Sequence, residues 1–560
     1  MLELEFVTNK LSFNKIDVEV LDKEEYIANL FPIVYILFDE MTMCAYIGES
    51  TNAKSRLATH LSHTEKSKLK KVYIVSSPLF NKSAALDIES YLIQSMPSLG
   101  FNLLNGNAGI ANHNYYQKSL YSKLFKSIWS QLTFDNVEPK SLLEIRNSDI
   151  FKYSPYKTLT QDQFNSSIEI LNNITTQNKV TTFVNGLAGT GKTILAVYLI
   201  KVLSDYQSYD SDEFADLDDA LKTVITNLKS AYPHGLNIGF VVPMTSLRNT
   251  LKSVFGKIHG LSRKMVIGPS DVVKHKYDLL IVDEAHRLTR RVSITNYRAF
   301  DNTNKQLGLD DGTQLDWILK SSTHQVLFYD SEQSIKPADV RKEDFDNIKA
   351  LPTSTEVKLV SQLRSNGGKD YISFVDNLLN SRLPVNSKTF SSPDYELVMF
   401  NTMGEMVEQL RKRESEHGLS RMMSGYSWKW VSKENESTPD SVIDGIGLTW
   451  NRVSKDWINS TTDATEMGCI HTVQGYDLNY AGVIFGEEIT FDKEENLITV
   501  NKEKYFDAKG KAAIDSPEEL HSYIIKIYKT MMYRGIKGTY IYVCDPDLKD
   551  YFSKTIMRKN

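Results

Sequence analysis

Short apolar runs alternate with longer amphipathic stretches along most of this chain, and that alternation predicts its secondary structure. Hydrophobic runs at 181–186, 238–243, 277–284 and 324–330 are separated by stretches with helical spacing. Strands of a parallel sheet read as continuous apolar runs because helices cover both faces of the sheet. The pattern therefore predicts an α/β body built on a parallel sheet.

A second series of apolar runs follows and predicts another body of the same kind. Its runs lie at 395–401, 468–475, 481–486 and 538–545. The economical interpretation is two α/β bodies in tandem, which we place at 155–350 and 351–560. No internal repeat of fixed period accompanies them.

The first hundred residues follow a different pattern, that of a small α/β domain. Two short runs at 33–38 and 44–48 flank a polar segment, which indicates a β-hairpin. Helical spacing at 52–61 and 81–95 surrounds a further strand at 71–75. We expect this domain to span 1–111, with a polar helical connector at 112–154.

Composition narrows the class of protein. The chain has 560 residues, 41% of them hydrophobic and 24% charged, which is ordinary for globular domains and allows roughly three or four of them. The three cysteines, Cys44, Cys469 and Cys544, are far apart, so neither a disulfide scaffold nor a zinc ribbon is expected. The acidic start and the lack of a long apolar run predict a cytoplasmic protein with no membrane partner.

The net charge of the chain restricts which part of its surface is expected to bind nucleic acid. The net charge is −5, so binding must come from local basic surface. One candidate cluster contains Lys66, Lys68, Lys70 and Lys71. The alternative interpretation of this cluster is a solvated helix end or loop.

A phosphate-binding motif follows the run at 181–186. It fits G-x(4)-G-K-[ST] and consists of Gly186, Gly189, Gly191, Lys192 and Thr193 with the residues between them. Backbone N–H groups of such a loop surround phosphate oxygens at a helix N-terminus. Lys192 is expected to contact the β and γ phosphates, and Thr193 to hold Mg²⁺.

Two adjacent carboxylates end the run at 277–284. They are Asp283 and Glu284, in the sequence Asp-Glu-Ala-His. ATP hydrolysis needs an acid that positions Mg²⁺ and a neighbour that polarises the attacking water. Together with the phosphate loop, this pair predicts an ATPase whose cofactors are ATP and Mg²⁺.

With these motifs in place, residues 155–548 resemble the superfamily 1 helicases. Val242-Pro243-Met244-Thr245 resembles the segment that contacts single-stranded DNA in that family. The resemblance implies two RecA-like motor domains and gives roles to further residues. The matching residues are Gln163 for adenine, Gln333 for the γ-phosphate, Arg364 and Arg534 as arginines that reach across to ATP, and Gln474 with Gly475 in the late Q-G motif.

Within that superfamily, the chain looks similar to an uncharacterised group of bacterial P-loop proteins. The shared stretch is Gly425-Tyr426-Ser427-Trp428-Lys429-Trp430. Its tryptophans are candidates for stacking on bases. We favour the alternative that they belong to the core, because aromatic residues at strand spacing usually do.

The N-terminal unit resembles the GIY-YIG nuclease domain. Tyr35 and Tyr46 lie across the predicted hairpin, and Arg56 and His60 share one face of the next helix. Glu89 lies in the following helix, and Asn102 closes the unit. Only the first glycine of the family pattern is missing, since Ile33 stands in its place.

The chemistry of phosphodiester hydrolysis explains why these residue types are needed. A tyrosine made acidic by nearby cations is a general base, and Arg56 is placed to bind the scissile phosphate. The resemblance implies that Glu89 holds one Mg²⁺ or Mn²⁺ beside the leaving oxygen. A milder alternative is a domain that binds DNA and cuts it poorly.

These observations predict an ATP-dependent DNA helicase or translocase with an N-terminal metal-dependent endonuclease. Its expected partner is single-stranded or branched DNA, and protein partners or self-association stay open. Resemblance alone favours anti-phage defence. The alternatives are a repair or recombination helicase whose N-terminal unit binds without cutting, and an ATP-driven switch that does not translocate.

Overall fold

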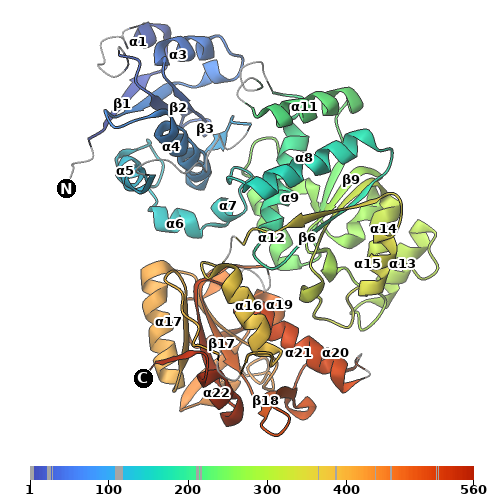
Figure 1. The fold of residues 1–560 in the computed structure, drawn as a ribbon. Helices are drawn as coiled ribbons and strands as arrows, with labels where there is room; N and C mark the ends of the chain where they lie inside the picture. Colours follow the sequence, from blue (N-terminus) through green and yellow to red (C-terminus); the bar gives the residue numbers. More distant parts are fainter. Residues whose placement is uncertain are drawn as a thin grey trace. The chain divides into compact units, whose positions relative to one another are not determined.

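Figure 1 shows the fold of the computed structural model, coloured along the sequence. The chain divides into two compact units. The structure describes residues 5–19, 21, 27, 29–106, 118–209, 214, 217–362, 365–384, 387–435, 437–453, 457–473, 475–512, 514 and 516–559. The first unit contains Met1–Thr175, Thr193–Leu236 and Leu251–Met265; the second contains Thr176–Lys192, Asn237–Thr250 and Val266–Asn560. No helix within the described ranges is long and apolar enough to cross a membrane.

The first unit contains a five-stranded sheet built around the predicted hairpin. The strand order is β1 (Val7–Ser12), β4 (Lys71–Ser76), β2 (Ile33–Asp39), β3 (Cys44–Ser50) and β5 (Asn102–Leu103). Helices α1 (Lys15–Glu19), α3 (Ala53–Leu61) and α4 (Lys82–Ser95) belong to the same part of the chain. The antiparallel pairing of β2 with β3 and the two longer helices confirm the predicted elements.

Both faces of this sheet are covered, which explains why β2 is buried along its whole length. Tyr35 and Leu37 pack on one side with Leu57 of α3. Phe38 faces the other side, where its ring lies 6.5 Å from that of Phe101 and 5.1 Å from that of Phe134. Alternate residues of a strand point to opposite faces, so an all-apolar strand belongs between two layers.

Residues that follow this sheet in sequence pack against it. Helix α5 (Lys118–Gln131) precedes Thr133, whose carbonyl accepts a 2.7 Å hydrogen bond from the Tyr73 hydroxyl of β4. Helices α6 (Leu142–Asn147) and α7 (Asp149–Lys152) come next. The beginning of the expected connector therefore adds to the N-terminal core, while the boundaries at 111 and 154 stay predictions. The rest of the first unit includes α8 (Gln161–Thr176), most of α9 (Lys192–Asp205) and α11 (Asp219–Ala231).

A six-stranded parallel sheet in the second unit confirms the first predicted α/β body. Its order is β11 (Ser354–Leu359), β6 (Thr181–Gly186), β10 (Ser322–Tyr329), β9 (Tyr277–Val282), β7 (Ile238–Val241) and β8 (Val266–Ile267). Every neighbouring pair is parallel. The helices of this part are α12 (Thr245–Phe255), α13 (Tyr297–Leu307), α14 (Gln314–Ser321) and α15 (Lys342–Lys349).

An eight-stranded sheet, also in the second unit, is the second predicted body. Its order is β14 (Ser441–Ile443), β15 (Ile446–Trp450), β16 (Glu466–Cys469), β13 (Ser420–Ser424), β17 (Leu478–Phe485), β20 (Gly535–Val543), β12 (Glu396–Phe400) and β21 (Met557–Lys559). Only the β14–β15 pair within it is antiparallel. The accompanying elements are α16 (Gly368–Leu379), α17 (Met403–His417), α18 (Trp457–Ser460), α20 (Ala508–Ala512), α21 (Pro517–Met532), α22 (Pro546–Ser553) and the hairpin β18 (Ile489–Asp492) with β19 (Leu497–Val500).

The strand expected at 468–475 is wrong beyond its second residue. Strand β16 ends at Cys469, and Ile470–Val473 form the short helix α19. Ile470 and Val473 are both buried. Periodicity cannot distinguish a short apolar strand from a buried helical turn, which is why the sequence misled here.

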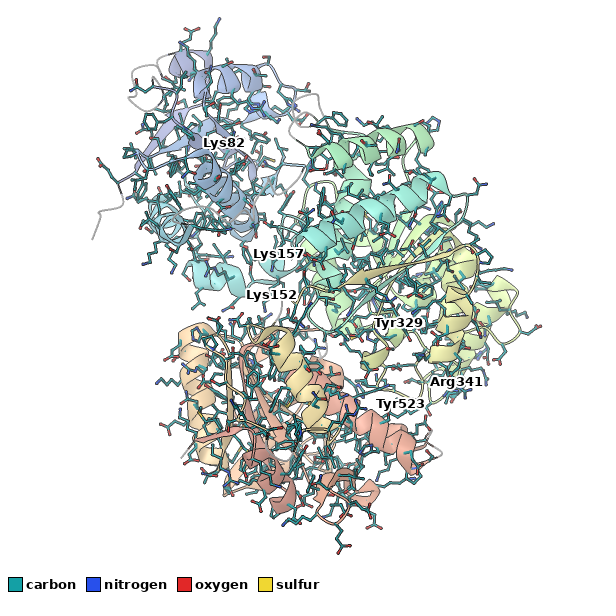
Figure 2. All side chains as sticks on the ribbon, in the orientation of Figure 1. Lys82, Lys152, Lys157, Tyr329, Arg341 and Tyr523 are labelled. Atoms are coloured by element: carbon teal, nitrogen blue, oxygen red, sulfur yellow. The ribbon has the colours of Figure 1, made fainter. Side chains whose placement is uncertain are left out.

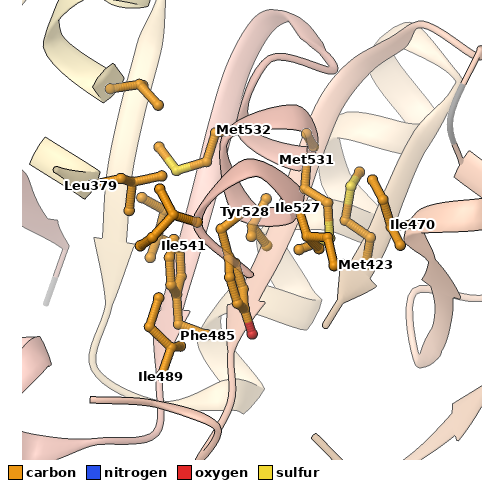
Figure 3. Close-up of a cluster of buried hydrophobic side chains, with 14 of the residues drawn as sticks. Leu379, Met423, Ile470, Phe485, Ile489, Ile527, Tyr528, Met531, Met532 and Ile541 are labelled. Atoms are coloured by element: carbon orange, nitrogen blue, oxygen red, sulfur yellow. The ribbon is translucent and has the colours of Figure 1, made fainter. Parts of the chain in front are cut away.

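Helix α21 supplies much of the core of this second sheet (Figure 3). Ile527, Tyr528 and Met531 are buried, and the Tyr528 ring stacks on Phe485 of β17 with centroids 4.4 Å apart. Ile541 of β20 completes the contact in the same cluster. This packing fixes the end of α21 and the start of β20, and Arg534 lies between these two elements.

The buried carboxyl group of Glu488, which contacts Tyr528 of α21, leads to a prediction about stability. Glu488 is fully buried and accepts hydrogen bonds from the Tyr528 hydroxyl at 2.6 Å and from the Ser427 hydroxyl. Burial raises the pKa of Glu488 above 4.5, although the two hydroxyl groups oppose that rise. The folded state therefore holds this proton more tightly than the unfolded state does. The free energy of unfolding consequently falls as pH rises above 4.5, the ordinary pKa of a glutamate.

We expect Glu488→Gln to remove that loss, because an amide of the same shape cannot ionise. Thermal unfolding between pH 4.5 and 8 should show the wild-type midpoint falling relative to that of the variant. A constant difference between the two midpoints at every pH would contradict this assignment.

Candidate nucleotide-binding and nuclease sites

The phosphate loop joins β6 to α9, and its glycines are required by its shape. Gly189 and Gly191 have φ angles of 86° and 76°, in the left-handed region that side chains disfavour. A Cβ on Gly186 would lie 2.5 Å from Thr190 Oγ1 and 3.2 Å from Leu359 Cβ. The loop therefore needs glycine at the two positions that the motif specifies, Gly186 and Gly191, and also at Gly189.

Lys192, the first residue of α9, is buried under this loop. Its Nζ donates hydrogen bonds to the carbonyl oxygens of Gly186 at 2.6 Å and Leu187 at 3.2 Å, and lies 3.4 Å from Asp330 Oδ2. Thr193, the second residue of α9, is half-buried. The ammonium group is thus held at the mouth of the loop by oxygen atoms alone.

Strand order places the acidic motif at the same edge of the sheet as the loop. Strand β10 lies between β6 and β9 with its Tyr329 opposite Asn185 and its Leu327 opposite Val282. Because carboxyl ends of parallel strands share an edge, Asp330 comes between the phosphate loop and Asp283. Tyr329, at the end of β10, is labelled in Figure 2.

Asp283 and Glu284 follow β9 and are both buried. Asp283 Oδ1 accepts the Glu284 N–H at 3.0 Å, and Glu284 Oε2 lies 2.8 Å from His286 Nε2. Burial opposes ionisation of Glu284, yet His286, Lys192 and Arg534 together hold its pKa well below the usual range. Glu284 is therefore an anion, the form that can polarise a water molecule.

Gln333 and Arg534 complete a continuous polar network. Gln333 Nε2 donates to Asp330 Oδ2 at 2.6 Å, and Gln333 Oε1 accepts from Arg534 Nη2 at 3.3 Å. Arg534 is buried and also donates to the carbonyl oxygen of Tyr476 at 3.4 Å. Within the second unit, Asp330 thereby joins Lys192 to Gln333, and Gln333 contacts Arg534, while Lys192 and Arg534 both favour the anionic form of Glu284.

A cavity of 1010 Å³ in the second unit borders this network. Gly186, Thr190, Asp330 and Gln333 form part of its wall. Six cations also line it, namely Lys342, Lys349, Lys358, Lys369, Arg382 and Lys529, against the four carboxylates Asp330, Glu332, Asp346 and Asp376. Sequence reasoning missed these cations because they come from separate elements and share no motif.

The remaining predicted helicase residues have other surroundings. Gln163 is buried in the first unit, where its Oε1 accepts the Thr160 N–H at 3.0 Å. Gly475 has a φ of 95°, whereas Arg364 and Gln474 lie outside the described residues. Trp428 packs against the core, as favoured, but Trp430 is 43% exposed, so the core interpretation is wrong for that residue.

The N-terminal sheet brings the predicted nuclease residues together. The Tyr35 hydroxyl and His60 Nε2 are 2.8 Å apart, and the His60 ring centroid lies 5.0 Å from that of Tyr46. Strand register explains the pairing, because Tyr35 lies opposite Gly48 and Tyr46 is its diagonal neighbour on the same face. A Cβ on Gly48 would collide with the Tyr35 ring, so this glycine is required.

Arg56 and Glu89 lie close enough to affect the ionisation of Tyr35. Burial raises the pKa of Tyr35 well above 10, while Arg56 lowers it and Glu89 and Glu49 raise it further. The expectation that nearby cations make this tyrosine acidic is therefore wrong, since burial outweighs Arg56. Burial therefore favours the neutral phenol of Tyr35, whose hydroxyl lies within hydrogen-bonding distance of His60 Nε2.

Two further residues, which the sequence did not place in the nuclease site, lie beside this cluster. Asn105 clamps the strand between Tyr46 and Gly48: its Oδ1 accepts the Ile47 N–H at 3.0 Å and its Nδ2 donates to the Ile47 carbonyl at 2.8 Å. Lys66 is 2% exposed, with its Nζ 4.2 Å from the centroid of the Tyr46 ring. The signal for Asn105 was a second asparagine three residues after Asn102.

The expected basic cluster is not one surface. Lys66 is buried, Lys68 forms a 2.6 Å ion pair with Glu65, and Lys71 forms a 2.6 Å ion pair with Asp135. The partner of Lys68 is a sequence neighbour, whereas the partner of Lys71 is 64 positions away and could not be seen in the local pattern. Burial and ion pairing reduce the free positive charge of this cluster, and its role in DNA binding stays a prediction.

One family of known proteins matches the part of the chain that contains the phosphate loop and the acidic motif. The model of the Schlafen group 3 DNA/RNA helicase domain matches residues 179–545, more than half of the chain. The chain belongs to this helicase family. This confirms the helicase part of the sequence prediction, while the GIY-YIG domain and the bacterial group stay predictions.

Individual relatives are distant. The uncharacterized protein YPL245W of Saccharomyces cerevisiae is 24% identical over 399 residues, which are 66% of this chain and 82% of the relative. Among solved structures, the Pif1 helicase from Bacteroides in complex with ADP-AlF3 and ssDNA is 14% identical, covers 68% of this chain and 92% of its own, and has a TM-score of 0.26. The DEAD-box helicase Mss116 bound to ssRNA and UDP-BeF is 13% identical, covers 75% and 79%, and has a TM-score of 0.33. At such TM-scores the structural likeness carries no argument about this chain.

Proposed function

We propose that the chain is an ATP-driven motor that translocates on single-stranded or branched DNA. The observation that carries this proposal is the network in which Asp330 joins Lys192 to Gln333, which in turn contacts Arg534. A motor needs its phosphate-binding lysine and its trans-acting arginine to respond to one another through the nucleotide state. The network links these two groups, which are far apart in sequence.

The residues present fit the chemistry of ATP binding. Lys192 exchanges its carbonyl partners for the β and γ phosphates, and Arg534 and Gln333 meet the charge that develops on the γ-phosphate. Glu284, held as an anion, orients the attacking water. The cations that line the neighbouring cavity favour an anionic ligand of nucleotide type.

Mg²⁺ is the metal that suits the available oxygens. The Thr193 hydroxyl and the buried carboxylate of Asp283 are hard donors of the kind that Mg²⁺ prefers. When bound, the ion neutralises phosphate charge. In sequence, Thr193 is the last residue of the phosphate-binding motif, and Asp283 directly follows β9.

A direct test is ATP hydrolysis by the full chain with no nucleic acid, with single-stranded DNA and with RNA of equal length. We expect single-stranded DNA to stimulate hydrolysis about tenfold or more, and salt to weaken the stimulation. Stimulation by RNA alone would mean that the motor translocates on RNA and not on DNA. No stimulation by either would favour a nucleotide-driven switch that does not translocate.

We also propose that the N-terminal domain is a metal-dependent endonuclease. The observation in its favour is the packed set of Tyr35, Tyr46 and His60, with Arg56 and Glu89 close enough to act on Tyr35. The Tyr35–His60 hydrogen bond gives the proton of an attacking water a path to the imidazole. Arg56 suits a scissile phosphate.

Glu89 is the residue we propose for the Mg²⁺ or Mn²⁺ of this nuclease. No group of three or more metal-ligating side chains occurs anywhere in the described part of the chain, so one carboxylate would share the ion with water. Mg²⁺ commonly keeps several waters and one or two carboxylates. Bound there, the metal would stabilise the leaving oxygen.

Nicking of supercoiled DNA by the full chain, with EDTA as the control, tests this activity. Comparison of no nucleotide, ATP and a non-hydrolysable analogue tests whether the motor restrains it. We expect the nicking rate to depend on nucleotide state, because an unrestrained nuclease would harm its host. Equal nicking rates in all three conditions would show that the chain carries two independent enzymes. The role in anti-phage defence stays a prediction from resemblance.

A further inference from the structure

Backbone hydrogen bonds pair two segments that follow strands of the six-stranded sheet, at the edge that carries the phosphate loop. One follows Glu284 and includes the turn Ala285–Arg287; the other follows Gln333. Val340 N donates to the Leu288 carbonyl at 2.7 Å, and Arg290 N donates to the Ala338 carbonyl at 2.8 Å. The water-polarising acid and the γ-phosphate glutamine are therefore carried on two paired pieces of backbone.

Asp339 is the centre of this pairing. Its Oδ2 accepts from Arg287 Nη1 at 3.0 Å, from Ile335 N at 3.1 Å and from Lys336 N at 3.0 Å. Asp339 and Arg287 are both buried. One carboxylate oxygen thus bonds the residue three positions after Glu284 and two of the residues that follow Gln333.

The ion pair is poorly suited to stability alone. Asp339 Oδ1 and Arg287 Nε are buried and make no hydrogen bond with any residue that the structure describes. A buried ion pair with unmet atoms contributes little net stability, and an apolar pair of similar size often does as well. A buried atom of this kind calls for an explanation, and a role in positioning the site is one that the backbone contacts of Asp339 favour.

Glu284 needs outside support for its backbone. Its φ is 49°, in the left-handed region, although it is not glycine. Such a conformation persists only where the surroundings hold it in place. The segment that follows Glu284 is anchored at Arg287, three residues later, by the ion pair with Asp339.

We propose that Arg287 and Asp339 are positioning residues that tie Glu284 to Gln333, so that Gln333 engaging a γ-phosphate sets the water-polarising carboxylate. This inference rests on the proposed ATPase and deepens it. Gln333 already contacts Asp330 and Arg534, so the tie extends the network from the phosphate side to the acid. Neither residue is expected to touch the nucleotide.

The first test is Asp339→Asn in the full chain, which keeps the side chain's size and leaves Arg287 without its anion. We expect kcat for ATP hydrolysis to fall about tenfold while KM for ATP stays within about twofold, since the phosphate contacts remain. The matched control is Asp301→Asn, which removes the exposed ion pair with Arg291 at 2.5 Å. The control should hydrolyse ATP as the wild type does, and a kcat for Asp339→Asn equal to it would overturn the proposal.

A double-mutant cycle distinguishes positioning from general damage. Gln333→Ala is made in the wild type and in Asp339→Asn, and kcat is measured in all four proteins. If Asp339 acts through Gln333, the second substitution costs less when the first is present. Strictly multiplicative losses would overturn the tie.

A milder variant covers the case in which Asp339→Asn does not fold. Arg290→Ala removes the guanidinium bonds to the Pro337 carbonyl at 3.1 and 2.8 Å from a half-exposed position. We expect about a threefold loss in kcat with KM unchanged. An unchanged kcat would overturn the proposal, whereas a wild-type chain without ATPase activity would refute the motor assignment instead.

Discussion

Lys192→Ala is expected to reduce ATP hydrolysis by at least about 100-fold, the usual cost of removing a charge that stabilises a transition state. The ammonium group is the cation at the mouth of the phosphate loop, where it bonds Gly186 and Leu187 carbonyls and lies 3.4 Å from Asp330. Alanine keeps the three glycines of the loop and removes the charge together with its hydrogen bonds to these two carbonyls. Phosphate release under saturating ATP and single-stranded DNA measures the effect.

Two companion variants make this result specific. Lys274→Ala removes an exposed lysine that pairs with Asp271 in the same unit, and it should retain full activity. Glu284→Gln should still bind ATP but turn it over slowly, because it loses the anion and not the phosphate contacts. Hydrolysis unchanged in both Lys192→Ala and Glu284→Gln would mean that the motor assignment is wrong.

Glu89→Ala is expected to abolish metal-dependent nicking, with a loss of about 100-fold or more, and to leave ATP hydrolysis within about twofold of the wild type. Glu89 lies in α4, whose neighbouring sheet has a hydrophobic core of its own. Loss of the carboxylate removes the proposed metal ligand while Tyr35, His60 and Arg56 remain. Nicking and ATPase assays on one preparation separate the two effects.

The matched control for this variant is Glu65→Ala. Glu65 is an exposed glutamate of the same domain that pairs with neighbouring Lys68 at 2.6 Å. It should nick DNA at the wild-type rate. If Glu89→Ala also does so, the nuclease centre lies elsewhere or the activity comes from a contaminant.

Local patterns were sufficient to predict much of the architecture. The buried strands β6, β9 and β10 read as continuous apolar runs because both faces of their sheet are covered. The phosphate loop was visible because left-handed backbone at Gly189 and Gly191 demands glycine. In each case a few neighbouring residues carry the whole physical requirement, so the requirement appears in the sequence.

Short apolar segments and isolated charges were harder to interpret. The helix at Ile470–Val473 read as a strand, since a buried turn and a buried strand show the same apolar run. Lys66 read as surface charge, but its side chain is buried over the Tyr46 ring. Burial depends on what packs from elsewhere, which the local pattern does not contain.

The sequence by itself therefore determined the loop, the acidic strand end and the hairpin tyrosines of this protein. Only the tertiary structure decided that Asp330 joins Lys192 to Gln333, that Asn105 clamps Ile47, and that Asp339 binds Arg287. Lys192 and Asp330 are 138 positions apart, and Gln333 and Arg534 are 201 apart. Contacts of this range depend on strand order and register, which arise from the packing of the whole chain.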